Sequence, residues 1–382
     1  MNWASDFLWL LWAVPLTLGG LIALGWWLRG LEQRQWRSSR AAGPQAYFRG
    51  LSHLLNEQQD AAIDAFIEAT QQDADTSELH FALGNLFRRR GDYDRAIRVH
   101  EHLLQRADLK TSDRHRAQHE LALDFLKAGL LDRAETAMQT LLDSPLAEQA
   151  RLALLGIHER ARDWGQASAM AAQLDGSAAG SFRGRMAHHA CELAQDALRQ
   201  GDLVVAEQHL RAALHHAPHH ARALMALANL QHQQGQTDTA VVTLLRCAEQ
   251  QPHALPLFAL SLAKWAATVP AQSERIMALL KSAHERQASV DITMALIQLA
   301  PQQRQHWLSN HLGRELSLAI AAESLADVSP LPEHALEAVK HAASPLQRYR
   351  CAACGFETHN YFWQCPGCQS WDSFPALRAE EL

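Results

Sequence analysis

A repeat of about 34 residues constrains this chain more than any other feature of its sequence. Small residues recur at intervals of 33 to 39 residues, at Ala62, Ala96, Ala134, Ala167, Ala206 and Ala240. A helix-breaking turn precedes most of them by about five residues, at Gly91-Asp92, Gly129, Asp163-Trp164, Gly201-Asp202 and Gly235. Each repeat is too short to bury its own apolar face, so stacked neighbours must share a core. The pattern predicts an all-α fold built from stacked helical hairpins.

The clearest copy is SELHFALGNLFRRRGDYDRAIRVHEHLLQRADLK at 77–110, which has the small residues and the Gly-Asp-Tyr turn of a tetratricopeptide repeat. We therefore predict a tetratricopeptide-repeat superhelix, an α-solenoid, with six repeats over 43–254. The pattern loosens over 255–347, where helical spacing of apolar residues persists and predicts degenerate repeats and capping helices.

Superhelices of this kind bind partners in a concave groove lined mainly by the first helix of each repeat. Counting from the start of the second and sixth repeats predicts a partner-binding groove lined by Phe81, Asn85, Arg88, Arg89, Met225, Asn229 and His232. Arginines in such a groove favour an acidic or carboxylate-terminated peptide. The alternative for each residue is an ordinary solvated helix position.

Two other features within the repeats have simpler interpretations. The turn HHAPHH at 215–220 is rich in histidine, but it surrounds Pro218 between two helices, and we interpret it as a solvated turn. Cys191 and Cys247 fall at helix positions that need a small buried residue, so we interpret both as structural.

The N-terminal segment predicts a membrane anchor. Residues 7–28, FLWLLWAVPLTLGGLIALGWWL, carry no charge, and at 1.5 Å per residue they extend about 33 Å, against roughly 30 Å for a hydrocarbon core. Arginines follow the segment in 29–42, whereas Asp6 precedes it, which excludes the usual signal-peptide order. The positive-inside rule then leaves the N-terminus outside and residues 29–382 in the cytoplasm.

The C-terminal module, 348–382, contains two Cys-x-x-Cys pairs separated by ten residues: Cys351, Cys354, Cys365 and Cys368. Each pair places two thiolates on one tight turn, and two such turns complete a tetrahedral shell of four sulfurs. Every ligand position is then filled by protein, so we predict a structural, rubredoxin-like site for one metal ion. Zinc is favoured over iron, although four thiolates accept both.

Composition excludes several classes of function. The formal net charge is −6, which provides no general basic surface for nucleic acid, and no nucleic-acid partner is expected. The chain has only five lysines, none in a Gly-rich phosphate-binding loop. Paired catalytic carboxylates, a nucleophile with its base and an open metal site are also missing from the pattern, so we expect no enzyme.

This order of modules resembles the lipopolysaccharide assembly protein B family (LapB, also called YciM) of Gram-negative bacteria. The most specific stretches are LGNLFRRRGDYDRAIRVHEHLL at 83–104, RYRCAACGF at 348–356 and YFWQCPGCQSW at 361–371. The resemblance implies an adaptor in the bacterial inner membrane, with a periplasmic N-terminus. It also implies protein partners: the membrane protease FtsH, the deacetylase LpxC whose degradation the adaptor promotes, and other lipopolysaccharide assembly proteins.

Two alternatives from other classes stay open. One is a rubredoxin-type electron carrier, which an iron centre would require. The other is a generic peptide-binding scaffold in a different membrane complex. The colour of the metal centre distinguishes the first alternative, and the proteins that copurify distinguish the second.

Overall fold

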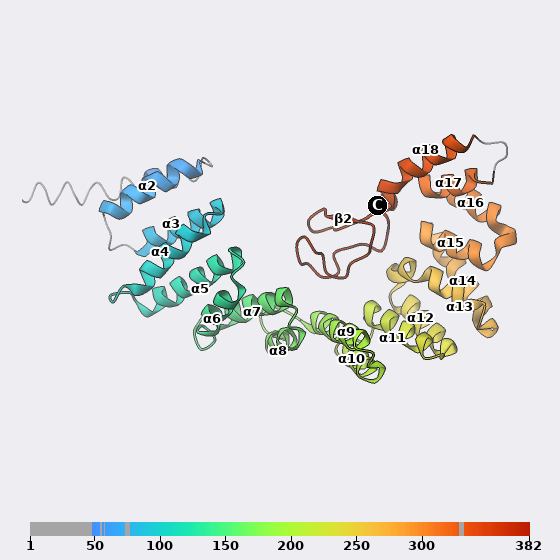
Figure 1. The fold of residues 1–382 in the computed structure, drawn as a ribbon, viewed down its shortest axis with the longest axis horizontal. Coiled ribbons are helices and arrows are strands. Elements are labelled where there is room, and N and C mark those ends of the chain that lie inside the picture. The colour runs from blue at the N-terminus through green and yellow to red at the C-terminus, as the bar shows by residue number, and fades with distance from the viewer. Residues whose placement is uncertain (1–47, 54–55, 57, 73–76, 328–331) are drawn as a thin grey trace, which may run out of the picture. The chain divides into compact units, whose positions relative to one another are not determined.

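The computed structural model describes residues 48–53, 56, 58–72, 77–327 and 332–382 (Figure 1). The predicted membrane anchor, 1–28, and the Arg-rich segment that follows it lie outside these ranges. Among the residues that are described, no helix has both the length and the apolar character needed to cross a membrane.

The chain divides into two compact units, residues 1–161 and 162–382. The described part of the first unit is helical. Its helices form antiparallel hairpins of the repeat type, with α3 against α4 and α5 against α6. They are α2 (Gln59–Gln72), α3 (Ser77–Arg90), α4 (Tyr93–Gln105), α5 (Thr111–Lys127), α6 (Leu131–Gln139) and α7 (Ala147–Ala161).

The second unit continues the hairpins and ends in a small ribbon. Its first helices are α8 (Trp164–Leu174), α9 (Arg183–Arg199), α10 (Leu203–His216), α11 (Ala221–Gln233) and α12 (Thr237–Gln250). The next are η1 (Pro252–Leu257), α13 (Ala259–Ala266), α14 (Pro270–Arg286), α15 (Val290–Leu299), η2 (Pro301–Gln303), α16 (Arg304–Leu312), α17 (Leu318–Leu325), α18 (Glu333–Ala343) and η3 (Ser344–Gln347). The ribbon contains β1 (Tyr349–Arg350), antiparallel to β2 (Glu357–Thr358), and the chain ends with η4 (Ala379–Glu381).

The alanines that recur once per repeat, here called the reference alanines, are buried. All six, from Ala62 to Ala240, are 0% exposed, because they lie where the two helices of a hairpin cross closely. Gly91, Gly129, Gly201 and Gly235 have φ between 79° and 84°, the left-handed conformation that ends a helix. In the turn before Ala167, Arg162 adopts this conformation instead, with φ of 59°. Glycine is therefore favoured but not required at this position.

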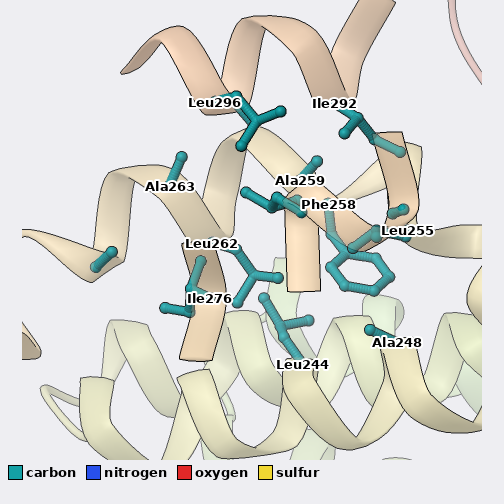
Figure 2. Packing of buried hydrophobic residues seen from close by; sticks show 14 of the residues in the cluster. Leu244, Ala248, Leu255, Phe258, Ala259, Leu262, Ala263, Ile276, Ile292 and Leu296 are labelled. Carbon is teal, nitrogen blue, oxygen red and sulfur yellow. The ribbon is translucent and has the colours of Figure 1, made fainter. Parts of the chain in front are cut away.

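The largest described core lies in α11 to α17, including the segment whose repeat pattern is weak (Figure 2). Leu244 of α12 points up toward Leu262 of α13, and Leu296 of α15 covers Ala259 from the other side. Leu262 and Leu296 are both fully buried. The described part of 255–347 is thus largely helical, and its helices α13 to α17 pack around this core, although the hydrophobic pattern has lost the 34-residue spacing.

Candidate metal centre

The ribbon is built from two similar turns, each carrying one Cys-x-x-Cys pair. In the first turn the amide of Gly355 donates to the carbonyl of Cys351 at 2.9 Å. In the second turn the amide of Gln369 donates to the carbonyl of Cys365 at 2.8 Å. The residue after each pair is left-handed, with φ of 77° at Gly355 and 63° at Gln369. Glycine is therefore not required at the position after the second pair.

The four sulfurs have the separation of a tetrahedral metal site. Cys351 Sγ lies 3.8 Å from Cys368 Sγ, and Cys354 Sγ lies 3.7 Å from Cys365 Sγ. A tetrahedron with metal–sulfur bonds of 2.3 Å has edges of about 3.8 Å. All four cysteines are free thiols rather than disulfides. The residues therefore fit a rubredoxin-like site for one ion, and this geometry suits both zinc and iron.

Neighbouring hydroxyl groups support the sulfurs. Ser373 Oγ lies 3.3 Å from Cys351 Sγ, and Ser370 Oγ lies 3.3 Å from Cys368 Sγ. Once a metal removes the thiol protons, each hydroxyl can donate a hydrogen bond to a thiolate, which stabilises its charge. Cys351 and Cys365 are buried, whereas Cys354 and Cys368 reach the surface.

Aromatic side chains supply the small core of the ribbon. Tyr349 and Phe374 are buried with Cys351 and Cys365, and the core is extended by Leu257 from η1 of the repeats. Tyr361 donates to the carbonyl of Phe374 at 3.1 Å. Burial raises the pKa of Tyr349 to about 12, so its phenol stays neutral. The aromatic residues thus form the core of the ribbon and help to dock it on the repeats.

One edge of the ribbon packs on α9. The ring of Trp371 stacks on that of His188 with a centroid distance of 4.4 Å and an interplanar angle of 20°. Next to it, His188 Nε2 donates to the carboxylate of Asp372 at 2.8 Å. The imidazole of His220 lies edge-on to His188, with centroids 4.3 Å apart. The hydrogen bond between His188 and Asp372 joins residues that are 184 positions apart in sequence.

The C-terminal tail docks the ribbon on two further helices. The guanidinium of Arg378 donates to both carboxylate oxygens of Asp291, at 3.2 and 3.0 Å. Glu381 accepts from the amide of Val290 at 2.5 Å, and Glu380 accepts from that of Leu318 at 3.1 Å. Each acidic side chain thus satisfies a free N–H at the start of a helix, α15 or α17, where the helix dipole favours negative charge.

The predicted groove residues of the second repeat differ widely in exposure. Phe81 is only 1% exposed and lies under the guanidinium of Arg116, 4.0 Å from the ring centroid, so its ring belongs to the core rather than to an open groove. Arg88 donates to Asn85, Glu120 and Asp124 at 2.5 to 2.9 Å. Its charge is compensated within the unit, which leaves Arg89 as the exposed arginine of the set.

In the sixth repeat, Met225 is half-buried and Asn229 is exposed. His232 stacks on Trp265 with centroids 4.5 Å apart. Assignment of this surface to a partner stays a prediction. Both internal cysteines are buried, and burial raises the pKa of Cys191 and of Cys247 to about 12. Such thiols are protonated and unreactive, as a structural role requires.

Sequence reasoning missed the residues that dock the ribbon. His188 has no motif around it, and His220 belongs to a turn that we expected to be solvated. That expectation holds for His219, which is exposed, and fails for His220, which packs against His188. The pairing of Arg378 with Asp291 had no local signal either. The density of histidines at 215–220 was the one available hint.

Comparison with known proteins gives matches for both modules and for the whole chain. Residues 349–375 match a family described as a rubredoxin metal binding domain, and residues 79–114 and 197–264 match tetratricopeptide repeat families. The chain is similar to lipopolysaccharide assembly protein B of Escherichia coli K12, with 28% identity over 95% of this chain and 97% of that protein. It is also similar to the protein of the same name from Haemophilus influenzae, with 29% identity over 88% and 90%. Among solved structures, a tetratricopeptide repeat protein from Parabacteroides merdae has 14% identity and a TM-score of 0.35, covering 68% of this chain and 99% of that one.

Proposed function

The chain belongs to the lipopolysaccharide assembly protein B family, and on this premise we propose that it regulates lipopolysaccharide synthesis as a membrane-tethered adaptor. In this proposal the protein holds the protease FtsH close to its substrate LpxC, and LpxC is degraded as a result. The observation that carries the proposal is similarity over 95% of this chain and 97% of the Escherichia coli protein.

The architecture supports a scaffold rather than a catalyst. Tetratricopeptide hairpins offer helix surfaces to protein partners, and four cysteine ligands fill a tetrahedral centre, leaving no position for a substrate. The ribbon is bonded to α9, α15 and α17 of the second unit, so it extends the surface of the repeats. We propose zinc as its ion. A colourless protein with one tightly held zinc agrees with this assignment, whereas the visible absorption of an iron–thiolate centre would favour an electron carrier.

The proposed anchor at 1–28 gives the adaptor its place. A tether confines the protein to the membrane and raises its effective concentration near a membrane-bound protease. The proposed location is the bacterial inner membrane, with the repeats on the cytoplasmic side, as the arginines after the anchor indicate.

Depletion in the host tests this function. Loss of the protein should raise the amount of LpxC and the lipopolysaccharide content, and the full chain should restore both. A chain without residues 1–28 should fold but fail to restore LpxC turnover. A chimera in which an unrelated single-span helix replaces 1–28 is the matched control, and it should restore turnover. If the untethered chain at native abundance works as well as the full chain, the tether mechanism is wrong; unchanged LpxC after depletion would refute the adaptor function itself.

A further inference from the structure

Three side chains with metal-binding chemistry meet where the ribbon lies against the repeats. They are His188 of α9, His220 at the start of α11 and Asp372 of the ribbon, and one ligand atom of each lies within 4.8 Å of the others. We propose that they bind a divalent transition-metal ion of the zinc type, at a second site separate from the four cysteines. This ion would fasten the ribbon to the repeats.

The chemistry of the three ligands fits such an ion. Two imidazoles and one carboxylate form a set that suits zinc and its neighbours in the first transition row. Magnesium and calcium prefer sites made of oxygen ligands. The ligands also come from both modules: the two histidines belong to the repeats, and the aspartate belongs to the ribbon. An ion held by all three therefore links the two modules directly.

Each ligand already has the net charge that a metal site requires. Burial lowers the pKa of His188, although its hydrogen bond to Asp372 opposes this, and burial lowers the pKa of His220 to about 3. Burial alone would raise the pKa of Asp372, but the hydrogen bond from His188 prevails and the pKa falls. Two neutral imidazoles and an ionised carboxylate are thus present at neutral pH, and an ion displaces no proton from a charged imidazole.

The hydrogen bonds within the cluster leave His188 incompletely satisfied. This side chain is buried, its Nε2 donates to Asp372, and its Nδ1 has no partner among the described residues. An ion bound at Nε2 would replace the hydrogen bond from Nε2 to Asp372, and the single ring proton would then lie on Nδ1, so the neutral imidazole can bind the ion without losing a proton.

The geometry needs little change to accept an ion. His188 Nε2 and Asp372 Oδ2 are 2.8 Å apart, whereas two ligands at 2.0 to 2.1 Å in a tetrahedron are about 3.3 Å apart. A small rotation of the Asp372 carboxylate provides the difference. His220 and Asp372 also line a cavity of about 760 Å³, so the fourth position of a tetrahedral ion has room for water.

The surrounding charge is compatible with a cation. The basic side chain near the cluster is Arg222, whose proximity contributes to the lowered pKa values of His188 and Asp372. Arg222 Nη2 pairs with Glu192 Oε1 at 2.8 Å, which balances its charge. The negative charge of Asp372 is therefore left to attract the ion.

Metal counting on the full-length protein tests the proposal. After saturation with Zn²⁺ and removal of loosely bound ion, the wild-type chain should retain two metal ions, and His220→Gln should retain one. Losing a direct ligand should weaken the second site by more than about 100-fold, since outer-shell changes alone cost about 10- to 100-fold. His253→Gln is the matched control: His253 lines the same cavity outside the cluster, and this variant should keep two ions.

Cobalt distinguishes the two sites in the same protein. Co²⁺ bound to the cysteines gives intense thiolate-to-metal absorption, which His220→Gln should retain because His220 belongs to the repeats and not to the ribbon. The second equivalent of Co²⁺ should add weak bands without sulfur character, and these should vanish in the variant. A wild-type chain that holds only one ion in excess Zn²⁺, or a His220→Gln variant that still holds two, would overturn the proposal.

Discussion

Replacing Asp291 by Asn should loosen the C-terminal tail from α15 while preserving the shape of the side chain. The carboxylate accepts two hydrogen bonds from Arg378, and the two side chains are 12% and 20% exposed. Removing one partner of a fully buried pair costs about 3–5 kcal/mol, whereas a surface pair contributes about 0–1 kcal/mol. Arg378 keeps its bond to the carbonyl of Gln347 and its stacking on Tyr349, so it is not left without partners. We therefore expect a loss of about 2 kcal/mol, between the two limits.

Amide hydrogen exchange at Leu318 measures this loss. Leu318 is the first residue of α17, so its amide has no partner within the helix and is held by Glu380 of the tail. If the tail opens as a unit, 2 kcal/mol corresponds to roughly 30-fold faster exchange. Glu357→Gln is the matched control, because it makes the same chemical change in an exposed ribbon pair with Arg350. The control should accelerate exchange less than about fivefold. Equal effects of the two variants would refute the reasoning, because the Asp291 pair would then behave as a surface ion pair.

Three further outcomes are expected. Replacing Cys351 and Cys354 together by Ser should release the metal and unfold the ribbon, because so small a module lacks an adequate core without its ion. The helical circular dichroism of the repeats should be retained, and a folded, metal-free ribbon would contradict this prediction. Burial raises the pKa of Glu381 to about 6 from 4.5, so its protonation favours the folded state. As pH falls from 7 to 4.5, the free energy of unfolding of the wild type should thus rise by up to about 2 kcal/mol relative to that of Glu381→Gln. Chemical denaturation at several pH values measures this difference, and a difference that does not change with pH would contradict the prediction. Leu244→Ala removes a side chain that is 1% exposed and should cost about 2–5 kcal/mol, whereas Val242→Ala, at a 49% exposed position of the same helix, should change the free energy of unfolding little.

Local patterns in the sequence were sufficient for the repeats and for the metal ligands. A reference alanine such as Ala96 is buried wherever the 34-residue spacing places one, because the crossing of two helices in a hairpin depends on residues close together in the chain. The two cysteine pairs, beginning at Cys351 and Cys365, likewise lie in short turns whose backbone hydrogen bonds span four residues. The sequence therefore determined the helical class of the fold and the four sulfurs of the metal centre.

The docking of the ribbon was decided by tertiary structure alone. His188 meets Asp372 across 184 residues, and Arg378 meets Asp291 across 87. Which helix the ribbon reaches depends on the summed rotation of every intervening hairpin, and no spacing in the sequence reports that sum. Burial follows from the same packing: it keeps His220 neutral against His188 instead of solvated in its turn, and it makes Phe81 a core residue. Such properties belong to the assembled stack, because the low dielectric and the partners that create them come from distant parts of the chain.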